Sequence, residues 1–227
     1  MKRIAFVLSA ILSLSSAAQA ADLGWNSGAS PMYSPTPASG WGGFYAGVSG
    51  GYGWGTLTRQ PAGGGVQTQN NTGGWQLGGQ AGYNMDMGGF ILGGEADLQW
   101  ANIGYSEDLG AGNTFKAGVD FYGTVRGRAG MAFGQVMPYV TGGFAAGRGT
   151  ASLTNGVGVT TSQSATHVGW TLGAGLEAQA TSNISIKAEY LYVDLGTQTY
   201  NGLPIAIGNI DATQRFSVVR AGLNYKF

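Results

Sequence analysis

Eight segments of this chain alternate between apolar and polar residues, and this alternation constrains the fold more than any other feature of the sequence. The last segment, 216–227 (FSVVRAGLNYKF), places apolar residues on one face of a strand and polar residues on the other: Val219, Ala221, Leu223, Tyr225 and Phe227 against Arg220, Gly222, Asn224 and Lys226. A period of two is the pattern of a β-strand with one apolar face. The other segments are 43–55, 72–85, 90–100, 118–132, 137–148, 166–180 and 184–195. The sequence therefore predicts an all-β chain of eight strands.

The connections between these segments alternate in length. Long polar stretches at 56–71, 101–117, 149–165 and 196–212 alternate with short links at 86–89, 133–136 and 181–183. Outer-membrane barrels have short periplasmic turns and longer extracellular loops. An eight-stranded sheet with an apolar outer face needs lipid against that face, and closure removes its unpaired edges. We therefore predict an eight-stranded antiparallel transmembrane up-and-down β-barrel over residues 42–227, in the bacterial outer membrane, with both termini in the periplasm.

A soluble, lipocalin-like barrel is the alternative fold, and side-chain volume argues against it. Such a barrel would turn the large apolar residues inward, and eight strands cannot enclose so many and still hold a lumen. Four tryptophans lie near strand ends, as in the aromatic girdle of a membrane barrel: Trp54, Trp75, Trp100 and Trp170. The sequence therefore favours lipid, not a soluble core, against the apolar face.

The N-terminal region predicts export. Residues 1–20 combine a basic start, an apolar run at 4–14 and a small-residue cleavage site at Ala18 and Ala20, as in a secretory signal peptide. The apolar run is too short to serve as a membrane anchor, which needs about 20 residues. Residues 21–41 are rich in Pro, Gly and Ser and predict an extended periplasmic linker.

Composition excludes several functional classes. The 11 Lys and Arg residues balance 11 Asp and Glu residues, so no net charge attracts nucleic acid. The absence of cysteine excludes disulfides and thiolate sites. The single histidine, His167, is expected at the surface, and neither Ser162 nor Ser164 pairs with it at a recognisable catalytic spacing. We therefore predict no catalytic site, metal site or cofactor, and no enzymatic activity.

Charged residues instead gather on the polar face of the strands, which would line the lumen. By parity this set contains nine residues: Glu95, Asp97, Asp120, Arg126, Arg128, Glu177, Lys187, Glu189 and Arg220. Isolated charges in a narrow lumen cost several kcal/mol each, so we expect them to pair with opposite charges from neighbouring strands. Ion pairing also makes two-carboxylate hydrolysis by Glu95 and Asp97 improbable. Two interpretations stay open: an electrostatic plug, or a charged constriction that tunes ion passage.

Five motifs carry a resemblance to a known family. FYGTVRGRAG (121–130), MPYVTGGFAAG (137–147), GWTLGAGLEA (169–178), IKAEYLYVDLG (186–196) and FSVVRAGLNYKF (216–227) resemble the RopB-like small outer-membrane β-barrels of alphaproteobacteria, which belong to the OmpA-type barrel superfamily. The resemblance implies a porin-like envelope protein with antigenic surface loops. Its role would be envelope integrity and interaction with host or environmental ligands through those loops, and the alternative is a narrow porin. Some relatives are described as haemin-binding, which suggests a third function, haem capture by His167 with Tyr105 or Tyr200 in the loops.

The C-terminal strand also predicts a partner. A terminal aromatic residue in an aromatic-rich strand resembles the signal that outer-membrane proteins present to the barrel-assembly machinery. In this chain the residues that match are Leu223, Tyr225 and Phe227. The predicted partners are therefore outer-membrane lipid, the assembly machinery and ligands at the loops.

Overall fold

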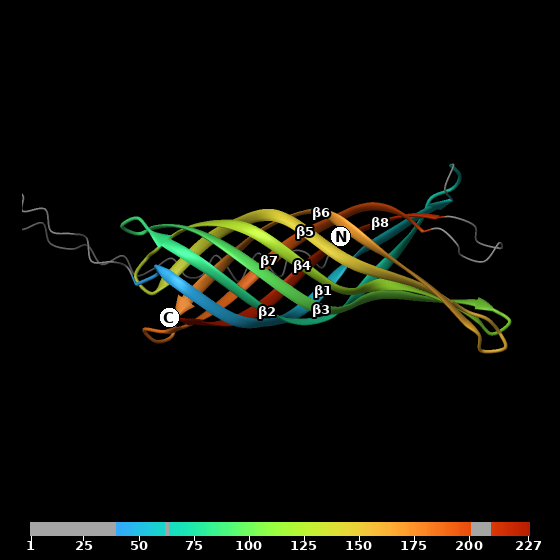
Figure 1. Cartoon of the computed structure of the whole chain (residues 1–227), viewed down its shortest axis with the longest axis horizontal. Helices are drawn as coiled ribbons and strands as arrows, with labels where there is room; N and C mark the ends of the chain where they lie inside the picture. The colour runs from blue at the N-terminus through green and yellow to red at the C-terminus, as the bar shows by residue number, and fades with distance from the viewer. Residues whose placement is uncertain (1–39, 62–63, 201–209) are drawn as a thin grey trace, which may run out of the picture. The chain divides into compact units, whose positions relative to one another are not determined.

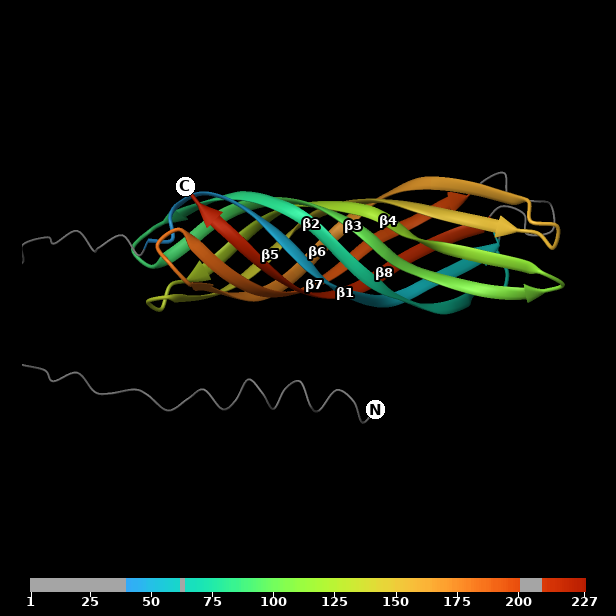
Figure 2. The same cartoon turned by 90° about the horizontal axis from the view of Figure 1, so that it is seen from below.

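A computed structural model describes residues 40–61, 64–200 and 210–227 of the chain (Figure 1). Eight antiparallel strands follow one another: β1 (Gly43–Pro61), β2 (Thr68–Asp86), β3 (Phe90–Gly110), β4 (Asn113–Met131), β5 (Val136–Thr154), β6 (Thr160–Gln179), β7 (Ile184–Tyr200) and β8 (Ile210–Lys226). Each strand pairs with the next, and β8 pairs with β1, so the sheet closes into a barrel (Figure 2). The predicted eight-stranded antiparallel barrel is confirmed.

The two described ends of the chain lie at the same end of this barrel, which we call the terminus end. The Gly40 carbonyl accepts a hydrogen bond from the side-chain Nε2 of Gln179 at 3.0 Å, and the backbone N–H of Phe227 donates to the Phe44 carbonyl at 3.0 Å. The predicted signal peptide, with its predicted cleavage site at Ala18 and Ala20, and the predicted linker up to residue 39 lie outside the described residues. No helix in the described part of the chain is long and apolar enough to cross a membrane.

The strands are much longer than the sequence predicted, and this corrects the four long loops. β3 and β4 are joined through Ala111 and Gly112 alone, both at positive φ, where a loop over 101–117 was expected. The stretches at 56–71 and 149–165 are likewise occupied largely by the ends of strands, and so are residues 196–200 and 210–212, whereas 201–209 lie outside the described residues. The expectation failed because it required an apolar outer face. These strand ends keep the period of two but reverse it, with polar residues outside and apolar residues inside.

Strand β8 shows this reversal within one element. Towards the terminus end Val219 and Leu223 are exposed and Arg220 is buried. Towards the opposite end, which we call the far end, Phe216 and Val218 are buried while Arg215 is exposed. The outer face therefore changes from apolar to polar along a single strand, as expected where a barrel leaves the bilayer and enters water.

At the far end the barrel wall divides into two sheets. The pairing of β2 with β3 reaches only Gly73 and Gly104, and the pairing of β6 with β7 reaches only Trp170 and Asp194. The other strand pairs continue further, so β7, β8, β1 and β2 form one sheet and β3, β4, β5 and β6 form the other. Figure 1 shows these two groups diverging at the right of the view.

A bulge in β4 places Asp120 outside the lumen and corrects the sequence prediction. The register of β4 against β5 shifts between Val119 and Phe121, so Asp120 and Phe121 are both exposed while Val119 is buried. One extra residue in a strand reverses the parity of everything beyond it. Asp120 accepts a hydrogen bond from the Thr150 hydroxyl on the outer face, and it does not belong to the lumen network.

Candidate functional site: the charged lumen

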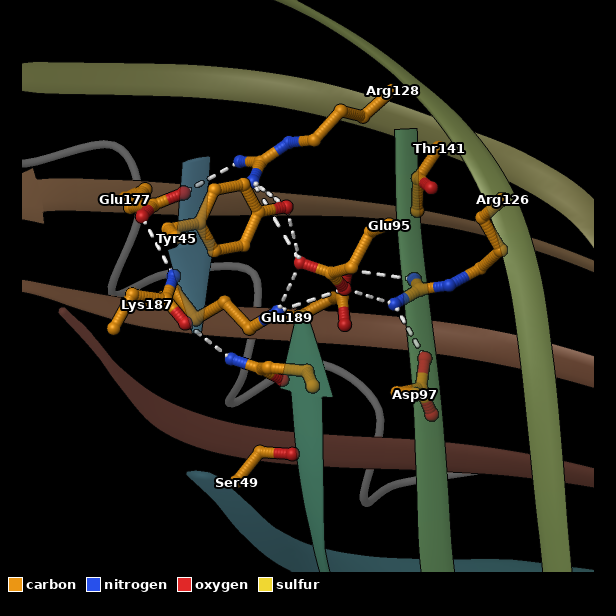
Figure 3. Close-up of polar contacts among 12 residues, drawn as sticks. Tyr45, Ser49, Glu95, Asp97, Arg126, Arg128, Thr141, Glu177, Lys187 and Glu189 are labelled. Atoms are coloured by element: carbon orange, nitrogen blue, oxygen red, sulfur yellow. Dashed lines mark hydrogen bonds and ion pairs between the residues drawn. The ribbon is translucent and has the colours of Figure 1, made fainter. Parts of the chain in front are cut away.

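A layer of eight charged side chains crosses the lumen, and Figure 3 labels all of them except Arg220. It contains four acids and four bases: Glu95 and Asp97 on β3, Arg126 and Arg128 on β4, Glu177 on β6, Lys187 and Glu189 on β7, and Arg220 on β8. Each of these residues exposes at most 7% of its surface. Their formal charges cancel, so the layer is neutral as a whole.

Arg126 joins three carboxylates at the centre of this layer. Its Nη2 donates to Glu95, and also to Asp97 Oδ2 at 2.9 Å. Its Nη1 donates to Glu189 Oε1 at 2.9 Å. One guanidinium therefore connects β4 to β7 across the lumen as well as to its neighbouring strand β3.

Arg220 and Lys187 complete the network from the opposite wall. Arg220 Nε donates to Glu189 Oε2 at 2.7 Å, and Arg220 Nη1 donates to Asp97 Oδ1 at 3.1 Å. Lys187 Nζ donates to both oxygens of Glu95 at 2.9 Å. Each central carboxylate therefore contacts at least two cations, which compensates the cost of removing it from water.

Two tyrosines belong to the network in addition to the predicted charged residues. Tyr45 donates its hydroxyl to Glu95 Oε2 at 2.8 Å and accepts a hydrogen bond from Arg128 Nη1 at 3.0 Å. Tyr139 donates to Glu189 Oε1 at 3.1 Å, and its ring lies 4.1 Å from the Arg128 guanidinium carbon. Both residues lie on the inward face of their strands, so the same alternation that predicted the charged residues could have identified them.

Arg128 and Glu177 form the part of the layer closest to the terminus end. Arg128 Nη2 donates to Glu177 Oε2 at 2.5 Å. The other oxygen of Glu177 accepts hydrogen bonds from Ser185 at 2.5 Å and Asn224 at 2.8 Å. Hydroxyl and amide donors thus hydrogen-bond the Glu177 oxygen that is not paired with Arg128.

Side chains occupy the room that lumen glycines provide. A Cβ at Gly51 would lie 2.7 Å from Arg220 Cβ, and a Cβ at Gly82 would lie 2.4 Å from the Tyr45 hydroxyl. Glycines on the inward face of the strands leave room that either arginine side chains or water could fill. At these two positions the charged layer and its tyrosine take the space.

Apolar clusters lie on both sides of the charged layer. Towards the terminus end Trp41, Ile91, Met137 and Tyr139 pack together, and the Trp41 indole donates to the Gly134 carbonyl at 3.2 Å. Towards the far end the first cluster contains Ile103, Val119, Tyr122, Ala145, Leu191, Val193, Leu195, Phe216 and Val218. A second cluster follows between the two sheets, with Leu57, Phe115, Ala117, Ala151 and Ala212. Apolar side chains therefore separate the charged layer from both ends of the barrel.

His167 is not at the surface, and this corrects the sequence expectation. Its side chain faces inward, is 0% exposed, and lies against the backbone of Leu195 and Gly196 on β7. The only histidine of the chain is therefore withdrawn from the outer surface, where an axial ligand to haem would have to stand, while Tyr105 lies on a different strand, β3. Among the described residues no group of three or more His, Asp or Glu side chains is placed to hold a metal ion.

Comparison with known proteins decides the family. The family model described as "Outer membrane protein beta-barrel domain" matches residues 5–227. This chain belongs to that family. The 31 kDa outer-membrane immunogenic protein of Brucella melitensis is 34% identical over 227 residues, which cover 92% of this chain and 93% of that protein. The 25 kDa outer-membrane immunogenic protein of the same organism is 34% identical over 100% of this chain and 99% of that protein.

The structural comparison supports the same fold. The outer membrane protein OprG of Pseudomonas aeruginosa matches 83% of this chain and 98% of its own, with a TM-score of 0.50 and 13% identity. At this identity the match shows the fold alone. The predicted membership in a small alphaproteobacterial outer-membrane barrel family is thus confirmed, and the chain is an outer-membrane β-barrel surface protein.

Proposed function

We propose that this protein is a sealed barrel that strengthens the envelope and presents an interaction surface at its far end. The observation that carries the proposal is the charged layer, in which all eight side chains are buried and ion-paired. A conducting constriction needs charges that water and ions can reach. A buried, neutral layer between apolar clusters supports a plug instead.

The proposed orientation places the terminus end in the periplasm and the far end outside the cell. The short connections 87–89, 132–135 and 180–183 lie at the terminus end, as periplasmic turns do in this class of barrel. The far end carries polar outer faces, including Thr150, Ser162 and Thr213. The proposed partners are outer-membrane lipid, the barrel-assembly machinery through Leu223, Tyr225 and Phe227, and host or environmental ligands at the far end.

Planar-bilayer recording of the refolded protein tests the sealed barrel. We expect no stable unit conductance from protein that is demonstrably inserted and resists unfolding at room temperature on a gel. The Arg126→Ala variant is the informative comparison, because it removes the cation that joins three carboxylates, and Arg215→Ala is its matched control outside the lumen. Steady unit steps in the wild type that change in Arg126→Ala but not in Arg215→Ala would establish the alternative, a narrow porin.

A further inference from the structure

Strand β6 has an open edge at the far end. On one side it pairs with β5 as far as Thr154 and Thr160, whereas on the other side its pairing with β7 ends at Trp170 and Asp194. His167 contacts the β7 backbone where the two strands begin to separate. Within the described part of the chain, residues 160–166 therefore have a sheet neighbour on one side only.

The turn into β6 shows which backbone groups point to the open edge. The Asn155 amide donates to the Val159 carbonyl at 2.9 Å, so this pair is hydrogen-bonded and the next pair, Thr154 with Thr160, is not. Side chains approach closely in non-hydrogen-bonded pairs, as the 3.0 Å contact of the Ser152 and Ser162 hydroxyls shows. Every second residue of this stretch therefore points its backbone N–H and C=O groups away from β5, towards the open edge: Thr160, Ser162, Ser164 and Thr166.

The far end has a second place where neighbouring strands separate, between β2 and β3, and charged side chains protect the strand edges there. Between β2 and β3, Arg59 reaches from β1 to Glu107 on β3 at 3.2 Å, and its guanidinium carbon lies 4.8 Å from the Phe115 ring centre. Asp108 adds a further charge to the β3 edge. Charges and prolines are the usual protection of exposed edges, and the sequence 160–166 (TTSQSAT) has neither.

We propose that the open edge of β6 at 160–166 binds an extended polypeptide segment of another protein, which adds to the sheet as a strand. This proposal rests on the far end being an interaction surface. Main-chain hydrogen bonds supply the affinity in such complexes, and pockets for alternate side chains supply the specificity. Ala165 faces inward and packs against the cluster that contains Phe115 and Ala151, while Ser162 and Ser164 face outward. The segment that fits is uncharged, with small apolar residues alternating with hydroxyl residues.

A second copy of this chain does not fit the edge. Copies inserted in one membrane share the same vertical orientation, so a two-fold axis along the membrane normal relates them. With strands tilted by about 35–45°, the two β6 edges would cross at about 70–90°. Strands at that angle cannot form a ladder, so the partner must come from outside with a free extended segment.

A peptide-binding measurement on the full-length mature protein in detergent micelles tests the proposal. The probe is a fluorescein-labelled peptide that alternates Val and Thr and has the length of 160–166. Ser162→Pro removes one N–H from the open edge without touching the β5 ladder, and Ser162→Ala is its matched control, which keeps the N–H. We expect saturable binding to the wild type and to Ser162→Ala, and binding weaker by about tenfold in Ser162→Pro.

Amide hydrogen exchange supplies a second measurement that does not depend on a variant. In the peptide-free wild type, the amides of Ser162 and Ser164 should exchange fast, and those of Thr161 and Gln163, which face β5, slowly. Equal protection of the two sets, no saturable binding to the wild type, or equal affinity of the Pro and Ala variants would each overturn the proposal. A silent bilayer with no peptide binding leaves the sealed barrel standing, whereas conductance by the wild type refutes the sealed barrel whatever the peptide does.

Discussion

The two halves of this barrel place the same kinds of side chain on opposite faces. In the half near the termini, Val48 and Leu98 face outward while Arg126 and Glu95 are buried. In the far half, Phe115, Leu57 and other apolar residues are buried, and the outer face is made of hydroxyl and charged residues. The same eight strands thus carry a membrane-protein pattern at one end and a soluble-protein pattern at the other.

The difference teaches that the environment, not the strand, decides which face is apolar. Lipid accommodates apolar side chains on the outer face. The polar side chains that face the lumen must then form ion pairs with one another. In water the reverse arrangement is favourable, because apolar side chains are then buried between the walls. The two halves therefore depend on different interactions, and substitutions should separate them.

Removing one cation from the charged layer should have the largest effect. Arg220→Met would leave Glu189 and Asp97 short of a partner in a buried site, and we expect a loss of about 3–5 kcal/mol in the free energy of unfolding. Urea titration of the protein in lipid vesicles would measure this loss. Arg215→Met is the control on the same strand, because the Arg215 side chain is 56% exposed and its pairing with Asp194 is worth about 0–1 kcal/mol. Equal losses for both variants would mean that the charged layer does not hold the barrel together.

Removing an apolar side chain from the far half should have a smaller and more local effect. Phe115 is 1% exposed and lies between the two sheets, so Phe115→Ala should cost about 3 kcal/mol there. We expect faster proteolysis of the far half while the remaining barrel keeps its heat-resistant mobility on a gel. Phe133→Ala, at an exposed turn of the terminus end, is the matched control. Unchanged proteolysis in Phe115→Ala would contradict an apolar core between the sheets.

The sequence predicted the membrane half almost completely and the far half poorly. The alternation with a period of two is visible within each short segment of the sequence. It is enough to predict the eight strands, their order and the inward direction of Glu95, Arg126 and Arg220. The far strand ends have polar outer faces, so their sequence resembles that of loops. The division into two sheets depends on which strands pair, and the sequence of a single strand does not contain this information. The contacts of Arg126 with Glu189 and of Lys187 with Glu95 cross the lumen, so they depend on closure of the barrel and not on neighbouring residues.

The smallest effect should come from the residue that the bulge removes from the lumen. Asp120 lies on the outer face with Thr150 as its partner, so Asp120→Ala should change the free energy of unfolding by no more than about 0.5 kcal/mol. Asp97→Ala is the contrasting variant on the neighbouring strand β3, because Asp97 is buried between Arg126 and Arg220 and its loss leaves two cations short of a partner. The same urea titration compares the two variants. A large loss in Asp120→Ala would mean that β4 keeps its parity through Val119 and that the bulge, with the outward placement of Asp120, is wrong.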